Sequence, residues 1–166
     1  RENRIKNIKR YIDLTMCLFN FEHDYYKSKN LPSIHIGHPF SELFKEDTQL
    51  IFKKYDLDPL KKYISILPGS RVSEIENLLP TYIEFIDLHL NKNQDYIYLI
   101  PASDHRIFET IDNLVPKSLP VKISTDSAKD FLSISNYSIV TSGTATLEAA
   151  ILGACPIICY KTNPVN

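Results

Sequence analysis

Two short loops carry the residues best suited to bind an anion, and the first reads Leu-Pro-Gly-Ser-Arg-Val-Ser-Glu-Ile from Leu67 onward. Gly69 allows a ligand to approach the backbone closely, and Ser70 is suited to cap the helix that follows. Arg71 would then stand in the first turn of that helix, where the helix dipole disfavours a cation. A positive charge in such a place indicates an anionic ligand.

The second loop reads Thr-Ser-Gly-Thr-Ala-Thr-Leu-Glu-Ala-Ala from Thr141 onward. Ser142, Gly143 and Thr144 would begin a helix, where free backbone N–H groups and the dipole attract phosphate. Glu148 lies four residues after Thr144, about one turn along, so its carboxylate could accept hydrogen bonds from ribose hydroxyls. A helix end for a diphosphate and a carboxylate for a ribose together predict a nucleotide site.

Both loops also have a purely structural interpretation. The first could only turn the chain and cap a helix while Arg71 points to solvent, and it matches neither a Walker loop nor G-x-G-x-x-G. In the second, Glu148 could be an ordinary acidic residue near a helix start. A capping box, however, needs its acid three residues after the cap, and from Thr144 that position is Leu147. The structural interpretation therefore explains Glu148 less well.

A parallel sheet is expected to position both loops at the carboxyl ends of its strands. From Tyr63 onward, short β-branched runs alternate with segments of helical period. The runs are too continuously apolar for one-sided antiparallel strands, and lie at residues 63–67, 96–101, 121–124, 137–141 and 156–160. Helices are expected after Gly69, with a kink at Pro80, and at residues 105–114, 126–134 and 144–152. This pattern predicts an α/β fold with a Rossmann-like, doubly wound parallel sheet.

The upstream region is expected to be the end of a preceding α/β domain. Two strands are predicted at residues 11–19 and 33–36, separated by a short helix at 22–29. A turn-rich connector follows at residues 37–44, then a helix from about Asp47 to Tyr55. We therefore divide the chain into residues 1–40 and 41–166. Because the first residue is Arg1 and the last segment stops just after a strand, we expect an internal fragment of a longer protein.

Composition limits the class of protein. The chain has 166 residues, 43% of them hydrophobic, which is enough for a sizeable core. With 19 Lys and Arg against 20 Asp and Glu, no basic excess indicates a nucleic-acid partner. The three cysteines, Cys17, Cys155 and Cys159, lie in apolar runs and are interpreted as reduced core thiols of a cytoplasmic protein. No apolar run approaches the roughly 20 residues that span a bilayer, and no signal peptide opens the chain.

The loop residues resemble two signature stretches of the lipid-A-disaccharide synthases of Gram-negative lipopolysaccharide synthesis. The first is Leu67-Pro-Gly-Ser-Arg followed by Glu74 and Leu-Leu-Pro at 78–80, and the second is Ser-Gly-Thr-Ala-Thr-Leu-Glu-Ala-Ala-Ile-Leu-Gly from Ser142. Gly37-His-Pro matches the family's interdomain turn. Phe-Asn-Phe-Glu at 19–22 resembles its Leu-Pro-Phe-Glu, and Arg1 resembles the end of its Trp-x-Trp-Arg stretch.

This resemblance implies a two-domain GT-B glycosyltransferase, with residues 1–40 ending the acceptor-side domain and 41–166 forming a UDP-sugar domain truncated at its C-terminus. The family transfers 2,3-diacylglucosamine from UDP-2,3-diacylglucosamine to 2,3-diacylglucosamine 1-phosphate with inversion and releases UDP. Arg71 would be catalytic by stabilising the leaving diphosphate, and neither a metal nor another cofactor is implied. The substrate-binding residues would be Gly69, Ser70, Arg71, Ser142, Gly143, Thr144 and Glu148, with His38 near the cleft. The general base would lie earlier in the first domain, outside this chain.

The resemblance also implies a cytoplasmic enzyme that is peripheral on the inner membrane and able to form a homodimer when full length. A basic cluster could attract anionic lipid or be a merely solvated face; it comprises Arg1, Arg4, Lys6, Lys9 and Arg10. Two alternatives remain open: another UDP-sugar enzyme of this fold, such as an N-acetylglucosaminyltransferase or an epimerase, and a noncatalytic nucleotide-binding domain. A dehydrogenase is less favoured because the first loop lacks G-x-G-x-x-G.

Overall fold

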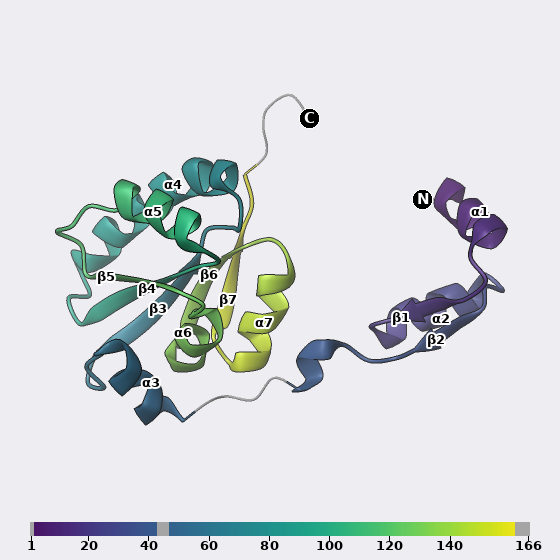
Figure 1. Cartoon of the computed structure of the whole chain (residues 1–166), viewed down its shortest axis with the longest axis horizontal. Coiled ribbons are helices and arrows are strands. Elements are labelled where there is room, and N and C mark those ends of the chain that lie inside the picture. Colours follow the sequence, from purple (N-terminus) through teal and green to yellow (C-terminus); the bar gives the residue numbers. More distant parts are fainter. Residues whose placement is uncertain (1, 43–46, 162–166) are drawn as a thin grey trace. The chain divides into compact units, whose positions relative to one another are not determined.

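The computed structural model describes residues 2–42 and 47–161, which fall into two compact units, Arg1–Leu43 and Phe44–Asn166 (Figure 1). Each unit is an α/β structure with a parallel sheet. Arg1, the start of the basic cluster, and the last two residues of the predicted connector, 43 and 44, lie outside the described residues.

The first unit pairs two short parallel strands, β1 (Thr15–Cys17) and β2 (Ser33–His35). Its helices are α1 (Glu2–Tyr11), α2 (Asn20–Ser28) and the 3-10 turn η1 (Pro39–Glu42). The predicted strand at residues 11–19 was wrong over most of its length. Ile5, Ile8 and Tyr11 recur every three residues, which suits a helical face, and the helix ends where Ile12 N donates to Ile8 O at 2.9 Å.

The second unit is a five-stranded sheet in which every pair of neighbouring strands is parallel, in the order β5-β4-β3-β6-β7. The strands are β3 (Lys62–Leu67), β4 (Tyr96–Ala102), β5 (Val121–Thr125), β6 (Tyr137–Thr141) and β7 (Cys155–Cys159). The chain begins at the centre, winds out to β5, then crosses back to β6 and β7. This order confirms the predicted doubly wound fold and places its switch point between β3 and β6.

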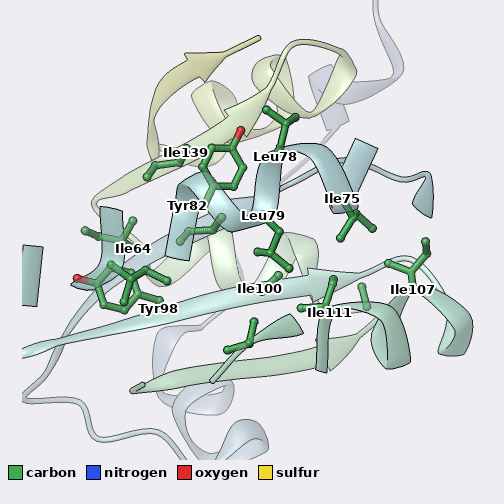
Figure 2. Close-up of a cluster of buried hydrophobic side chains, with 14 residues drawn as sticks. Ile64, Ile75, Leu78, Leu79, Tyr82, Tyr98, Ile100, Ile107, Ile111 and Ile139 are labelled. Atoms are coloured by element: carbon green, nitrogen blue, oxygen red, sulfur yellow. The ribbon is translucent and has the colours of Figure 1, made fainter. Parts of the chain in front are cut away.

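Helices cover both faces of this sheet, with α4 and α5 on one side and α3, α6 and α7 on the other (Figure 1). They are α3 (Thr48–Tyr55), α4 (Val72–Leu90), α5 (His105–Leu114), α6 (Ala128–Ile134) and α7 (Thr144–Leu152). Figure 2 shows the larger core, where Ile75, Leu79 and Tyr82 of α4 pack over the sheet. Pro80 lies inside α4, which continues for ten more residues to Leu90, and the kink predicted there stays a prediction.

Side chains of β3 and β4 alternate between the two faces. Ile64 and Ile66 face the α4–α5 side, whereas Tyr63 packs with Leu99 of β4 on the α3–α6 side. One sequence interpretation needs correction here. Cys17 is buried, but Cys155 on β7 is exposed and is therefore not a core thiol, because β7 is an edge strand with few covering side chains.

Candidate ligand pocket at the switch point

A pocket of about 530 Å³ lies at the carboxyl ends of the central strands, within the second unit. Four strand-to-helix loops line it: the β3–α4 loop, the β4–α5 loop, the β5–α6 loop and the β6–α7 loop. Its volume falls in the range typical of small-molecule and cofactor sites. Open α/β sheets bind ligands at this position because two neighbouring crossovers leave the switch point on opposite faces and open a crevice.

The β3–α4 loop is held in shape by Glu74. Its Oε2 accepts a hydrogen bond from Ser70 N at 3.2 Å, and its Oε1 lies 3.3 Å from Nη1 of Arg71. Gly69 has φ +123°, and a Cβ there would lie 2.6 Å from Glu74 Oε2 and 2.8 Å from Glu74 Cβ. Glycine is therefore required at position 69 both by the backbone conformation and by the close approach of Glu74.

The start of α4 differs from the sequence prediction in two details. Ser70 does not cap the helix, and Arg71 is not in the first turn; Arg71 is itself the N-cap, with extended φ −119° and ψ 141°. The reason is that Glu74 accepts from the backbone N–H of Ser70 and holds it in the loop, so the helix begins one residue later than expected. No side chain caps α4, so its first N–H groups remain available beside the guanidinium of Arg71, whose side chain is 79% exposed.

The β6–α7 loop supplies a second uncapped helix start. Gly143 is the N-cap of α7, and no side chain caps this helix either. Its φ of 165° is extended backbone that any residue adopts, and a Cβ would meet nothing nearer than Thr141 O at 3.9 Å. Neither the backbone nor packing demands glycine at 143, so its effect is to leave open space against the pocket. Thr141 ties the two loops together, because its hydroxyl donates to Leu67 O at 3.1 Å.

Glu148 lies one turn into α7 and lines the same pocket, as the sequence predicted. Its side chain is partly buried, and burial raises the pKa of its carboxyl group. Among the described residues, no hydrogen bond or ion pair reaches this carboxylate. A half-buried acceptor with unused lone pairs in a pocket is suited to receive hydroxyl donors from a ligand.

Sequence reasoning missed the β5–α6 loop, which forms another wall of the pocket through residues 126–129. Asp126 has φ 50°, a left-handed conformation that Asp tolerates, and its N–H donates to Ala102 O at 3.3 Å. The predicted helix began at Asp126, two residues before the observed start of α6, so Asp126 and Ser127 were assigned to a helix and not to a loop. The signal was available, because an Asp-Ser pair directly after a strand of a parallel sheet faces the ligand end.

All seven candidates predicted on these two loops line the pocket: Gly69, Ser70, Arg71, Ser142, Gly143, Thr144 and Glu148. His38 lies in the first unit, where its Nδ1 accepts from Phe40 N at 3.1 Å and its ring lies 5.3 Å from that of Phe19. These local contacts stabilise a turn, and the role of His38 as a ligand contact stays a prediction. In residues 2–42 and 47–161 no group of three or more His, Cys, Asp or Glu side chains could hold a metal ion.

The parallel sheet is wound outward from its centre, and a pocket lies at its switch point between two uncapped helix starts. These features define a doubly wound α/β protein with a candidate ligand site. The family model described as lipid-A-disaccharide synthetase matches residues 1–166. The chain belongs to this family.

Curated relatives agree with the family assignment. The lipid-A-disaccharide synthase of Acinetobacter baylyi is 37% identical over 179 residues, which cover 100% of this chain and 45% of the relative. Those of Koribacter versatilis and Azoarcus sp. are 33% and 30% identical, covering 100% and 97% of this chain and 44% and 43% of the relatives. The chain thus spans somewhat less than half the length of these relatives.

Proposed function

We propose that this chain contributes the UDP-sugar-binding half of a lipid-A-disaccharide synthase. The whole enzyme would transfer 2,3-diacylglucosamine from UDP-2,3-diacylglucosamine to 2,3-diacylglucosamine 1-phosphate, invert the anomeric centre and release UDP. Membership of the family and the names of the relatives support the reaction. The residues of the pocket support the division of roles described next.

One observation carries the proposal: two uncapped helix N-termini, those of α4 and α7, open on a single pocket. Each leaves backbone N–H donors unused and adds the positive end of a helix dipole, so two phosphate groups can be held without a metal ion. Arg71 adds an exposed charge-assisted donor beside the first of these ends. The diphosphate of a UDP-sugar has the charge and the two phosphate groups that this arrangement suits.

In the proposed reaction, Arg71 and these N–H groups act on the leaving group. The acceptor hydroxyl attacks the anomeric carbon, the bond to the diphosphate oxygen breaks, and its electron pair leaves with UDP. Preorganised donors at the developing negative charge lower the barrier for that departure. Arg71 makes a 3.3 Å contact to Glu74 at the exposed surface, and exchanging such an exposed ion pair for phosphate costs little.

Glu148 is assigned to the ribose. Its carboxylate lies on α7 one turn beyond the helix start that would hold phosphate, and its lone pairs are unused by the described protein groups. Ribose follows the diphosphate in UDP, so the two contacts fit one bound ligand. The general base that takes the acceptor's proton is proposed to lie in the portion of the relatives that this chain does not match.

The remaining assignments follow from the family. Residues 1–40 are proposed to end the acceptor-side domain, with His38 near the cleft, and residues 41–166 to form the UDP-sugar domain of a GT-B fold. The enzyme would work at the cytoplasmic face of the inner membrane and would form a homodimer when full length. No described helix is long and apolar enough to cross a membrane. Lipid attraction would come from exposed basic residues of α1, namely Arg4, Lys6, Lys9 and Arg10.

Calorimetry on the 166-residue chain tests the proposal, with UDP, ADP and pyrophosphate as ligands. We expect weak binding of UDP that exceeds that of pyrophosphate, and no disaccharide in a radiolabelled transfer assay on the same preparation. A folded chain that binds none of the three would reject the nucleotide site, and disaccharide formation by the chain alone would reject the placement of the base. For the membrane, liposome cosedimentation that persists after replacing all four basic residues of α1 with Ser would reject their role.

A further inference from the structure

The wall of the pocket formed by the β5–α6 loop is attached to the rest of the fold through a buried carboxylate. Asp130 follows the pocket-lining residues 126–129 directly and is only 5% exposed. Its Oδ2 accepts hydrogen bonds from Lys54 Nζ and from the hydroxyl of Tyr55, both at 2.7 Å. Both donors stand at the end of α3, so this carboxylate joins the last turn of one helix to the first turn of another.

The helix that Asp130 anchors cannot fix its own position. Helix α6 has seven residues, too short to be stable by itself, so tertiary contacts decide where it begins. Ser127 is its N-cap residue but makes no cap; its hydroxyl instead donates to Ser124 O at 2.9 Å. Phe131 packs against Tyr55 with ring centroids 4.8 Å apart, so Tyr55 contacts both Phe131 and its neighbour Asp130. The first turn of α6 is therefore located by α3.

Stability alone does not explain a charged group at this place. Burial opposes ionisation of Asp130, but hydrogen bonds from Lys54 and Tyr55 outweigh it and hold the pKa of the carboxyl below its usual value. The carboxylate is buried, whereas the Lys54 side chain is 60% exposed. A buried charge that is paired in this way is often no more stabilising than a well-packed apolar side chain of similar size, whereas its directional hydrogen bonds specify geometry. Directional bonds are what a pocket wall needs if its residues are to meet a ligand at fixed positions.

We propose that Asp130 is a positioning residue for the ligand pocket: by binding Lys54 and Tyr55 it fixes the start of α6, and with it the wall formed by residues 126–129. The affinity prediction below rests on the proposed nucleotide function, whereas the exchange prediction does not. Asp130 itself does not line the pocket, so its effect on ligands is transmitted through this wall.

Tyr55→Phe tests the proposal, with Tyr63→Phe as its matched control. Each removes one hydroxyl from a buried tyrosine of the same core cluster, but Tyr63 donates to Asp58 O at 2.6 Å and does not touch Asp130. Denaturant unfolding of both variants of the 166-residue chain measures their losses of stability, which are expected to be comparable because each variant loses one hydroxyl hydrogen bond. Asp130→Asn serves as a second, stronger perturbation and is expected to act in the same direction as Tyr55→Phe.

Two readouts separate positioning from stability. The amide of Phe131, which donates to Ser127 O at 2.9 Å, reports the start of α6 without any ligand. Its hydrogen exchange should be about tenfold faster in Tyr55→Phe than in Tyr63→Phe, and UDP should bind about fivefold more weakly, within the range for residues that act through packed networks. Equal exchange at Phe131 in the two variants overturns the proposal. Absence of UDP binding by the unaltered chain rejects the proposed function instead, and the exchange comparison still decides the role of Asp130.

Discussion

Gly143→Ala is expected to weaken ligand binding while leaving the stability of the fold nearly unchanged. The N-cap backbone at φ 165° accommodates alanine, and the added Cβ meets no atom closer than 3.9 Å. Replacing glycine gains about 0.4–1 kcal/mol by restricting the unfolded chain. Alanine is a less favourable N-cap residue than glycine, and this difference costs a similar amount, about 0.5–1 kcal/mol. The free energy of unfolding should therefore change by less than about 1 kcal/mol.

Binding of UDP should suffer much more. The methyl group would occupy open space beside the first N–H groups of α7, where we place a phosphate. A charge-assisted hydrogen bond contributes about 1.5–3 kcal/mol, so its loss weakens binding by roughly 10- to 100-fold. Calorimetric titration of UDP and urea unfolding on the same variant give both quantities. A dissociation constant within twofold of the unaltered chain, at unchanged stability, would refute the placement of phosphate at α7.

Further substitutions address the other groups. Arg71→Ala in a full-length enzyme should leave stability unchanged and lower turnover by about 100-fold, or roughly 3 kcal/mol, as for other single transition-state donors; near-normal steady-state rates would count against its role. Glu148→Ala should weaken UDP more than pyrophosphate, with Glu148→Gln intermediate, and equal weakening of both ligands in calorimetry would exclude the ribose contact. Asp130→Asn should cost about 1–2 kcal/mol at pH 7, because the Lys54 side chain is 60% exposed and the amide oxygen can still accept from Tyr55. Because the folded pKa of Asp130 is depressed, that stability is present above the unfolded pKa and is lost as pH falls through the folded pKa, so unfolding curves of the two proteins should converge in acid.

The doubly wound sheet was predictable because its strands are continuous apolar runs between turn residues. Residues 137–141 form β6 as predicted, and Lys62–Leu67 begins one residue before the predicted strand. The parallel order follows from the alternation of strands and helices, and it places both predicted loops at one edge. Most of the candidate pocket could therefore be proposed from local sequence together with one topological rule.

Two failures arose where a specific side-chain contact, and not local preference, decides where a helix begins. Glu74 determines where α4 begins by binding Ser70 N, which cap preferences alone do not predict. The start of α6 depends on contacts with α3, which is distant in the sequence. Lys54 and Asp130, which join the two helices, are 76 positions apart. The strand predicted at residues 11–19 failed for a different reason: its apolar residues also suit the end of a helix, and short apolar runs do not distinguish the two.

The central claim, that the starts of α4 and α7 together hold the diphosphate of UDP, is tested most directly by NMR. Titration of the ¹⁵N-labelled 166-residue chain with UDP should shift the amide resonances of Val72 and Ser73 at α4 and of Thr144 and Ala145 at α7 with one common dissociation constant. Gly143→Ala should abolish the response at α7 while the spectrum remains that of a folded protein. A folded chain whose amides at both helix starts stay unmoved by UDP would contradict the account.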